Sequence, residues 1–349
     1  MLSGGARLLT SRDYSEDRRL APSRRREPLR RRRRGDARPT LTMTIPRLSI
    51  GVPVYNGQDY LRFALDSIVR QDYTDFELII SDNASTDATQ EICRGYAAKD
   101  GRIRYYRNAT NIGASGNYNR VFELARGAFF KWAAHDDVHL PGCLKRCVEV
   151  FDQAPPNVAL VAPASEIIDE HGNTTVISVE CLDTRYPRAH QRLANVLQRV
   201  FWAPAQFGLF RFETLRKTRL IDPFFASDNV LLAEIAMLGE IWEIPEVLFQ
   251  RRLHPGVSTN VNRNWRELQV WFAPSQRGLK RFIPPPIRLG LEFMQSIARM
   301  PLPARERLLC YKAVFCVWYP RQGRRFVQDC RNKIAIRTRM KKALGRVAE

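Results

Sequence analysis

Between residues 48 and 134 the chain alternates short apolar runs with stretches in which apolar side chains recur at helical spacing. The apolar runs predict buried strands, and the stretches between them predict helices. Strand and helix in alternation with short connections favour a parallel sheet, because helices provide the right-handed crossovers that parallel strands need. We therefore predict an α/β fold, with a Rossmann-like and mostly parallel sheet flanked by helices.

The same patterns place the expected elements along the chain. In the first half, strands are expected over residues 48–54, 76–80, 103–106 and 128–134, with helices over 61–69, 86–98 and 118–125. The second half is expected to contain a helix to about 151, a strand near 158–161, a hairpin around 171–173, a helix over 188–201, an extended segment over 207–212, an apolar helix over 229–238, and short strands over 241–244 and 247–249. All of these elements lie within residues 43–264, which we take as one domain.

Polar clusters follow directly after three of the predicted strands. They are Tyr55-Asn56, Asp82-Asn83 and Asp136-Asp137. Ligands of parallel α/β sheets bind at the carboxyl ends of the strands, where the loops of several strands meet. We therefore expect the three clusters to converge in space and to form the functional site.

The carboxylates in these clusters allow two interpretations. Adjacent carboxylates such as Asp136 and Asp137 repel each other unless a cation neutralises them, and Mg²⁺ or Mn²⁺ commonly binds one or two carboxylates plus substrate phosphates. The alternative is a pair stabilised by the positive end of the helix after Pro141, although the apolar strand before the pair favours the site. Asp82 taken alone fits a helix cap, and only the neighbouring strand ends give it a functional interpretation.

The net charge of +20 lies at the two ends of the chain. Residues 1–42 hold 13 Arg and 5 acidic residues, residues 43–275 hold 25 basic and 27 acidic residues, and residues 276–349 hold 18 basic and 4 acidic residues. Clustered Lys and Arg attract anionic polymers or anionic membrane surfaces. We therefore expect the chemistry in the nearly neutral middle, and an anionic neighbour at the ends.

The Arg-rich start predicts a disordered tail over residues 1–42, because it has few apolar side chains. Whether this tail is translated, or translation starts at Met43, stays open. No apolar run reaches the roughly 18–20 residues that span a bilayer, and no signal-peptide-like stretch is present. The seven cysteines form no CxxC pair, which favours free thiols in a reducing compartment. The expectation is a cytoplasmic protein, at most peripheral on the inner face of the membrane.

The basic end predicts a helical C-terminal extension over residues 265–349. The triplet Pro284-Pro285-Pro286 marks a linker, and amphipathic helical stretches follow near 287–299 and 304–318. Two interpretations stay open for these helices. They suit contact with an anionic membrane surface, to which aromatic and apolar side chains would contribute, or a solvated basic tail packed on the domain. The side chains in question are Val314, Phe315, Trp318 and Tyr319.

Six segments between residues 46 and 256 occur in a fixed order: Val52-Pro53-Val54-Tyr55-Asn56-Gly57, Tyr60-Leu61, Ser67-Ile68-Val69-Arg70-Gln71, Phe76-Glu77-Leu78-Ile79-Ile80-Ser81-Asp82-Asn83-Ala84-Ser85-Thr86-Asp87, Asn111-Ile112-Gly113 and His135-Asp136-Asp137. As a series they resemble the signature of family 2 glycosyltransferases with the GT-A fold. The resemblance implies an inverting glycosyltransferase of the hexosyltransferase type. It would move a sugar from a nucleoside diphosphate sugar, commonly a UDP-sugar, to a hydroxyl of a glycan or lipid-linked acceptor in cell envelope polysaccharide biosynthesis. Residues 43–140 would form the nucleotide-binding half and residues 141–264 the acceptor half.

The resemblance also implies roles for residues in the nucleotide-binding half. The segment after the first strand, Pro53-Val54-Tyr55-Asn56, would line the nucleotide pocket, and Asp82 would accept a hydrogen bond from the base. The edge of the pocket would be shaped by Asn83, Ser85 and Asn111.

The expected metal motif departs from the family's pattern in one position. His135-Asp136-Asp137 matches an Asp-x-Asp type motif with His in its first position, so the number of carboxylates that touch the ion stays open. The resemblance implies that Asp136 contacts the ribose and that Asp137 binds a divalent metal, Mn²⁺ or Mg²⁺. His254 matches a histidine that approaches the metal or the diphosphate, and a surface histidine before Pro255 is its alternative.

Inverting transfer needs a base that takes the acceptor proton, and a carboxylate is the usual choice. Asp228, just ahead of the apolar helix, matches the family's base position. Its alternative is an N-cap, since Ser227-Asp228 also suits that role. A bound metal would polarise the diphosphate and stabilise the charge that develops on the leaving group.

Two alternatives from other classes remain at this point. A sugar nucleotidyltransferase could share the sheet and the metal, but the Gly-rich phosphate loop expected after the first strand is missing. A nucleic-acid-binding protein would use the basic ends, although these lack a recognisable recognition module. The organised motifs lie in the neutral middle, so nucleic acid is not the expected partner. A dehydrogenase does not fit, because no GxGxxG motif is present.

Overall fold

One sheet organises the described part of the chain. The structure is a computed structural model and describes residues 45–177, 182–199, 204–257, 265–272 and 283–324 of the 349 residues. The expected tail over residues 1–42 and Met43 lie outside the described residues. The strands are β1 (Leu48–Val54), β2 (Phe76–Asp82), β3 (Ile103–Arg107), β4 (Phe129–Trp132), β5 (Val138–His139), β6 (Val158–Ile168), β7 (Thr174–Ile177), β8 (Leu209–Arg211) and β9 (Glu240–Arg252).

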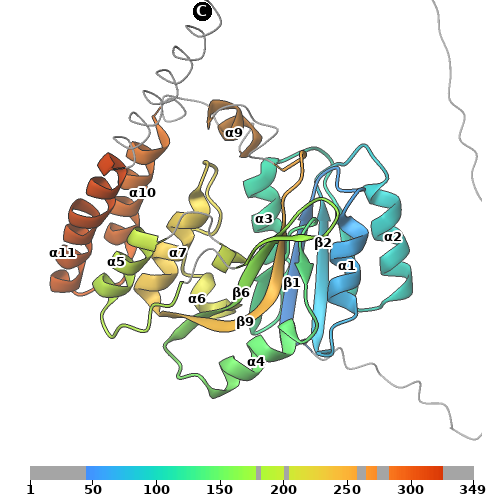
Figure 1. Ribbon diagram of the computed structural model, residues 1–349, viewed down its shortest axis with the longest axis horizontal. Helices are drawn as coiled ribbons and strands as arrows, with labels where there is room; N and C mark the ends of the chain where they lie inside the picture. Colours follow the sequence, from blue (N-terminus) through green and yellow to red (C-terminus); the bar gives the residue numbers. More distant parts are fainter. Residues whose placement is uncertain (1–44, 178–181, 200–203, 258–264, 273–282, 325–349) are drawn as a thin grey trace, which may run out of the picture. The chain divides into compact units, whose positions relative to one another are not determined.

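In the described residues the strands form a single sheet in the order β3-β2-β1-β4-β8-β6-β9-β5, and β7 pairs with β6 (Figure 1). β1 pairs in parallel with β2 and β4, and β2 pairs in parallel with β3. β6 and β9 are also parallel, while β8 runs antiparallel to both β4 and β6. The predicted mostly parallel sheet is confirmed, with its antiparallel pairs made by β5, β7 and β8.

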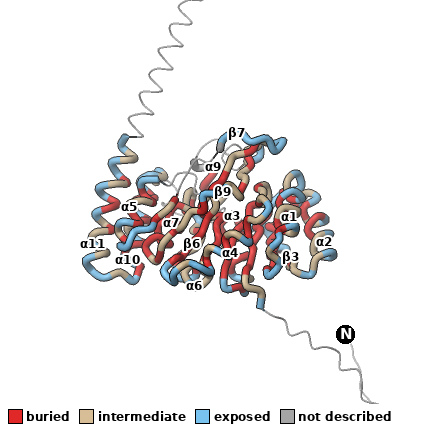
Figure 2. Tube along the Cα trace, turned by 60° about the horizontal axis from the view of Figure 1, so that its bottom comes forward, coloured by how far each residue is buried: buried red, intermediate tan, exposed pale blue. Residues whose placement is uncertain are grey.

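Helices cover both faces of this sheet. They are α1 (Leu61–Val69), α2 (Thr89–Lys99), α3 (Gly113–Glu123), α4 (Cys143–Gln153), α5 (Ala189–Arg199), α6 (Phe212–Leu215), α7 (Ser227–Leu238), α9 (Trp265–Phe272), α10 (Pro285–Arg299) and α11 (Ala304–Ala313). Side chains of α1, α2 and α4 share one hydrophobic cluster with β1 and β2, and those of α3 and α7 share a second cluster with β4. α5 and α10 pack against α7, and α11 packs against α5. The buried residues accordingly run along the strands and the inner sides of the helices (Figure 2).

The strand that carries the first motif is buried along its whole length. Every residue of β1 is buried, as expected for a strand with parallel neighbours on both sides and helices on both faces. Gly51 lies where α3 crosses this strand. A Cβ atom there would come within 2.5 Å of Val121 Cγ2, so only glycine lets the helix pack this closely.

The second half differs from the sequence prediction in three places. The two short strands expected over 241–244 and 247–249 are one strand, β9, whose pairing with β6 skips the Pro245 position. Proline lacks an N–H for the ladder, so the irregularity accommodates it without breaking the strand. The segment expected to be extended over 207–212 is extended only in β8, between a 3₁₀ turn and α6. The helix expected over 304–318 ends as an α-helix at Ala313 and continues as a π-helix over Val314–Trp318.

The described C-terminal helices, α10 and α11, share a hydrophobic core with the domain that precedes them. Phe293 and Ile297 of α10 lie in the same hydrophobic cluster as α7, together with Val314 and Trp318. The interpretation that places Val314 and Trp318 on a membrane is therefore wrong for these two side chains, which are 0% and 4% exposed. Within the described ranges, every helix is too short or too polar to cross a bilayer.

A buried ion cluster ties α10 to α7. The guanidinium group of Arg219 lies 2.9 Å from carboxylate oxygens of Asp222, Glu234 and Glu292. The hydroxyl of Ser296 in α10 donates to Glu234 at 2.6 Å, and both of these side chains are fully buried. Arg219 offsets part of the desolvation of the three carboxylates, which otherwise repel one another. Sequence reasoning gave no sign of this cluster.

Candidate active site

The loops after β1 and β2 bind each other at the carboxyl edge of the sheet. The Asn56 N–H donates to Ser85 Oγ at 3.0 Å, and the Thr86 N–H donates back to Asn56 Oδ1 at 2.9 Å. Asn56 and Ala84 have left-handed backbones, with φ of 49° and 62°. Such conformations cost free energy in residues other than glycine, and they cluster at functional sites where the surrounding contacts fix them. The structure therefore brings the first two predicted clusters together.

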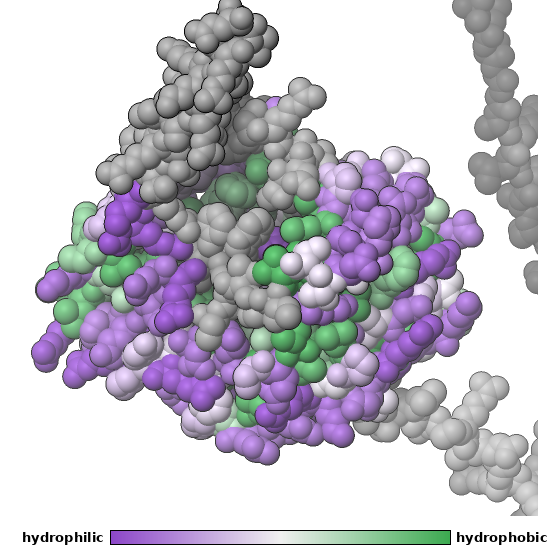
Figure 3. Space-filling model, viewed as in Figure 1, coloured by the Kyte–Doolittle hydropathy of each residue, from purple (hydrophilic) through white to green (hydrophobic). Residues whose placement is uncertain are grey.

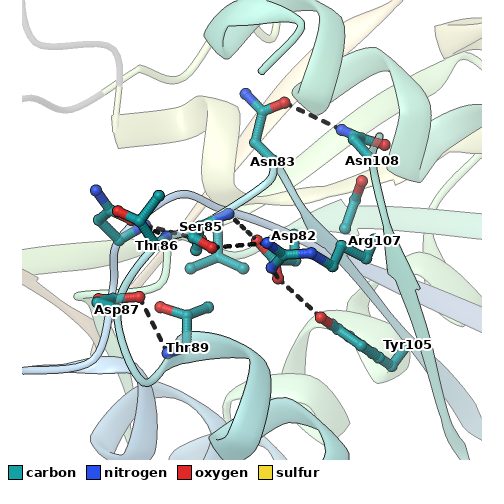
Figure 4. A network of polar contacts seen from close by, with 12 residues as sticks. Asp82, Asn83, Ser85, Thr86, Asp87, Thr89, Tyr105, Arg107 and Asn108 are labelled. Atoms are coloured by element: carbon teal, nitrogen blue, oxygen red, sulfur yellow. Dashed lines mark hydrogen bonds and ion pairs between the residues drawn. The ribbon is translucent and has the colours of Figure 1, made fainter. Parts of the chain in front are cut away.

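Asp82 anchors this edge from the end of β2, where its side chain is inaccessible to solvent. Its Oδ1 accepts the Ser85 N–H at 2.8 Å, and its Oδ2 accepts the Tyr105 hydroxyl at 2.7 Å and the Arg107 guanidinium at 2.6 Å (Figure 4). Burial raises the pKa of the Asp82 carboxyl, but these donors outweigh burial and hold the pKa below its ordinary value. The ionised carboxylate thus fixes the loop after β2 and two side chains of β3.

Asn83 ties the loop after β3 to the same edge. Its Nδ2 donates to Asn111 Oδ1 at 2.9 Å, and its Oδ1 accepts the Ile112 N–H at 2.9 Å and the Asn108 amide at 3.1 Å. Asn83 and Asn111, both predicted site residues, are therefore in direct contact. Their network holds the loop in one conformation.

The four residues expected to line the pocket, Pro53 to Asn56, differ in their exposure to solvent. Pro53 and Val54 are buried in β1, and the carbonyl of Val54 accepts the Asn83 N–H at 2.8 Å. Tyr55 and Asn56 are exposed in the loop that follows. At this loop Gly57 has no room for a side chain, because a Cβ would come within 2.6 Å of the His135 ring. Glycine here brings the β1 loop against the third predicted cluster.

The third cluster is bound to the end of β9. The Arg252 N–H donates to Asp137 Oδ1 at 2.9 Å, and Arg252 Nε donates to the Asp136 carbonyl at 3.0 Å. The His254 Nε2 lies 3.2 Å from Asp136 Oδ2. The structure thus brings together the predicted residues Asp136, Asp137 and His254, although His254 is 118 positions away from Asp136 in the chain.

The ionisation of Asp136 opposes the ionisation of its neighbour Asp137. Burial, followed by the charge of Asp136, raises the pKa of Asp137 to about 8. Burial also raises the pKa of Asp136, but the neighbouring His135 and His254 outweigh it, and the pKa lies below its ordinary value. A pair in which one carboxyl resists ionisation is what two adjacent buried acids produce when no cation is near.

The donor set at this edge fits a divalent cation that takes part of its ligands from a substrate. Among the described residues, no three His, Cys, Asp or Glu side chains are grouped so that they could hold a metal ion by themselves. The Asp136-Asp137 pair offers hard oxygen ligands, which suit Mg²⁺ and Mn²⁺. An ion at this pair would need further oxygens, and the phosphates of a substrate could supply them.

Tyr60 completes this part of the site from the start of α1. Its ring lies against the His254 ring with centroids 4.4 Å apart, and the Arg252 guanidinium lies 5.1 Å from the Tyr60 ring centroid. These contacts restrict the orientation of His254. In the sequence, Tyr60 is only part of the Tyr60-Leu61 motif. Its contacts cannot be predicted from there, because its partners lie almost 200 positions further along the chain.

Asp228 lies in the first turn of α7, which begins at Ser227 and is preceded by Ala226 with a φ of 64°. The helix therefore starts two residues earlier than predicted. Burial and, after it, the charges of Asp136, Asp137 and Asp228 raise the pKa of the Tyr118 phenol. All three carboxylates therefore act electrostatically on the same phenol, Tyr118.

Two polar atoms next to Asp228 lack partners. Ser227 Oγ and Asn229 Oδ1 are buried and form no hydrogen bond with the part of the chain that the structure describes. A buried polar group without a partner costs free energy, so such groups point to a ligand or water.

The comparisons with known proteins agree with this geometry. The model of glycosyl transferase family 2 matches residues 49–219, which include nearly all of β1, the whole of β2 to β4 and all three predicted polar clusters. The chain belongs to glycosyltransferase family 2. The protein is a glycosyltransferase. This result favours the predicted function over the two alternatives, a sugar nucleotidyltransferase and a nucleic-acid-binding protein.

Several known glycosyltransferases are similar in sequence or structure. An uncharacterised glycosyltransferase of Rickettsia prowazekii is 28% identical over 233 residues, which cover 64% of this chain and 69% of that protein. A GalNAc(5)-diNAcBac-PP-undecaprenol β-1,3-glucosyltransferase of Campylobacter jejuni is 32% identical over 188 residues, covering 54% and 59% of the two chains. The crystal structure of S. aureus TarS superposes with a TM-score of 0.54 at 17% identity, over 77% of this chain and 70% of that chain. The expected GT-A fold is thereby confirmed.

Proposed function

We propose that this glycosyltransferase moves a sugar from a UDP-sugar to a hydroxyl of a glycan or lipid-linked acceptor, with inversion at the anomeric carbon. The observation that supports the proposal most strongly is the convergence of the three strand-end clusters with His254, while the charge of Asp228 acts on the same phenol as the charges of Asp136 and Asp137 do. The S. aureus protein of the same fold has been crystallised with UDP-GlcNAc. The cytoplasmic location stays a prediction.

The nucleotide would bind in the first half, against the loops after β1, β2 and β3. Asn83, Ser85 and Asn111 hold these loops through the contacts described above. Both lone pairs of Asp82 Oδ2 are used by Tyr105 and Arg107. For the base to donate to this oxygen, the one-third exposed Arg107 side chain must release it. Arg107 would then act as a gate at the base pocket.

The diphosphate would lie beside Asp136 and Asp137. Asp137 is proposed to hold the divalent metal, Mn²⁺ or Mg²⁺, with His254 close by, and Asp136 to contact the ribose. When bound there, the metal would supply Lewis-acid stabilisation of the leaving diphosphate. The Tyr60 and Arg252 contacts keep His254 on this side of the site.

The acceptor would approach from α7. Asp228 is proposed to take the proton of the acceptor hydroxyl as its oxygen bonds to the anomeric carbon and the bond to the diphosphate breaks. One displacement inverts the configuration, and the transition state resembles an oxocarbenium ion. Ser227 Oγ and Asn229 Oδ1, which are buried without a partner in the described part of the chain, are proposed to bind the acceptor if it displaces the side chains that cover them. The Campylobacter relative is named for an undecaprenol-linked acceptor, which supports a lipid-linked acceptor and a role in the cell envelope.

Calorimetric titration of the full chain with UDP, GDP and dTDP tests this proposal, each with Mn²⁺ and with EDTA. We expect metal-dependent binding of UDP that Asp137→Ala abolishes. Asp72→Ala is the matched control, because Asp72 is half exposed in the segment between α1 and β2 and should leave binding unchanged. Binding of none of the nucleotides, or equal binding with EDTA, would contradict the proposal.

A further inference from the structure

The outer side of α11, and of the π-helix over Val314–Trp318 that continues it to Tyr319, carries a stripe of basic and apolar side chains. Arg305, Leu308, Lys312, Phe315 and Tyr319 follow at intervals of three and four residues, which places them on one face of a helix. Leu308 is 68% exposed and Phe315 is 58% exposed. Core positions on the same helix, such as Cys310 and Val314, face the opposite way. We call the five exposed residues the α11 stripe.

The stripe continues onto α10. Tyr319 lies directly over Gly290, where a Cβ would come within 2.6 Å of the tyrosine hydroxyl oxygen. Ile287 and Leu291 of α10 are 52% and 45% exposed on the neighbouring turns. Exposed apolar side chains therefore occur on both helices. On this side of the molecule, at the left of Figure 3, apolar and polar residues are interspersed. Exposed apolar side chains that gather on one face mark interaction surfaces.

The charges of the two helices are segregated. Between residues 283 and 324 the acidic residues are Glu292 and Glu306, and both turn inward. Glu292 pairs with Arg219, and Glu306 pairs with Arg188 and His190. Within residues 283–324, the exposed charged residues are therefore all basic: Arg299, Arg305, Lys312 and Arg324.

We propose that the α11 stripe and the adjoining surface of α10 bind an anionic lipid membrane. Leu308 and Phe315 enter the headgroup region, and Arg305 and Lys312 contact lipid phosphates above it. Alternating apolar and basic side chains on one helix face suit such an interface, because long basic side chains extend toward the headgroups while apolar neighbours insert. A nucleic acid would meet the charges but would leave Leu308 and Phe315 in water.

Co-sedimentation of the full-length protein with lipid vesicles tests this surface without any nucleotide or acceptor, so its outcome is separate from that of the proposed function. The vesicles contain phosphatidylcholine alone or with one part in three phosphatidylglycerol. We expect binding to the anionic vesicles only, weakened by salt. Leu308→Gln with Phe315→Gln should weaken it about tenfold or more, and Arg305→Glu with Lys312→Glu by a similar factor.

Matched controls separate the surface from general charge and hydrophobicity. Val176→Gln removes an exposed apolar side chain on β7, and Lys99→Glu reverses an exposed charge on α2; neither should change binding. Unchanged melting temperatures show that the stripe variants are folded. Vesicle binding that survives both stripe variants would overturn the proposal, as would salt-sensitive binding to a DNA duplex with no binding to vesicles.

Cys316 provides a second readout at the edge of the stripe. It is the exposed cysteine among those that the structure describes, and the other described cysteines are buried. With Cys181 and Cys330 changed to Ser, a fluorophore that senses polarity can be attached to Cys316. We expect its emission to shift to the blue with anionic vesicles and to stay constant with neutral ones. No shift despite co-sedimentation would show that another surface binds the lipid and would overturn the assignment.

Discussion

Each half of this glycosyltransferase contains a buried cluster of arginine and carboxylate, and the two clusters are built differently. In the nucleotide half, Asp82 and Arg107 are partners across the β2–β3 ladder, so the register of two neighbouring strands brings them together. In the second half, Arg219 binds Glu292 across 73 positions of chain and joins a loop to α7 and α10. The first cluster fixes loops of the proposed nucleotide site, and the second connects helices.

The comparison shows where function and stability reside. The polar groups of the first half lie at strand ends and in loops with left-handed backbones, a setting that costs stability and gives a ligand a fixed surface. The polar groups of the Arg219 cluster join a loop to α7 and α10, and Glu234 and Glu292 in it are buried. The proposed base Asp228 belongs to α7, yet its charge acts on the same phenol, Tyr118, as the charges of Asp136 and Asp137 do.

The largest expected effect tests whether one half of the domain binds the donor while the other supplies the base. Asp228→Asn should lower the transfer rate about 10²–10⁴-fold, because it removes the proposed base, while donor affinity stays unchanged. Steady-state transfer assays and nucleotide titration measure the two quantities. Asp183→Asn is the control, because it removes a carboxylate that is paired with Arg185 and has no proposed role in the reaction. A loss of donor binding in Asp228→Asn would show that the division is wrong.

Sequence reasoning recovered most of the first half for a physical reason. Strands such as β1 are buried on both faces and give continuous apolar runs, and the residues that follow them must lie at one edge of a parallel sheet. Asp82 and Asn83 could therefore be predicted as neighbours of Tyr55 and Asn56, whereas Asn111 was assigned to the site only by the family resemblance. The partners Tyr105 and Arg107 were missed, although their alternation on a strand that pairs with β2 was a usable signal.

The second half was predicted less well because its structure depends on contacts between distant residues. Arg219, Glu234 and Glu292 are ordinary charged residues in the sequence, and only the packing of α10 on α7 makes them a buried cluster. In the same way, nothing local indicates that Val314 and Trp318 face the core while Phe315 and Tyr319 face solvent. A helical period gives two faces, and tertiary packing decides which one is buried.

Stability measurements can break this comparison. Arg219→Met should lower the free energy of unfolding by about 3–5 kcal/mol, because it leaves buried carboxylates without their partner. Arg107→Met should cost clearly less, since Arg107 is 33% exposed and Asp82 keeps its bonds to Ser85 and Tyr105. Urea denaturation of both variants gives the difference. Equal losses would mean that the Asp82 cluster contributes as much to stability as the Arg219 cluster does.

The pH dependence of stability should have opposite signs in the two clusters. The folded-state pKa of Asp82 is lowered by its donors against burial, so its stabilisation is present above the unfolded pKa near about 4 and is lost as pH falls. The pKa of Asp222 is raised by burial and by Glu234 and Glu292, against the effect of Arg219. Its contribution is therefore largest below about pH 4 and is lost as pH rises through the folded pKa.

Replacing each acid by its amide makes these signs measurable. Relative to the wild type, Asp82→Asn should lose stability between about pH 3 and pH 7, by about 2 kcal/mol at the upper end, because charged hydrogen bonds are lost. The stability of Asp222→Asn relative to the wild type should instead rise as the pH increases over the same range. Denaturant titrations at several pH values give both slopes, and slopes of the same sign would contradict the distinction between the clusters.

The smallest expected effect concerns the attachment of α11. Glu306→Gln removes the charge that pairs with His190 at 2.8 Å and Arg188 at 3.2 Å, and it should cost about 1 kcal/mol because the pair is only partly buried. Cys310, Val314 and Trp318 keep the helix on the core by apolar packing, so the global unfolding midpoint should move little. Amide hydrogen exchange that rises in α11 and not in α3 would show that the C-terminal helices open as a unit of their own. Exchange that rises equally in both helices would instead make α11 part of the same cooperative structure as the nucleotide half, and the contrast between the halves would then hold for chemistry but not for folding.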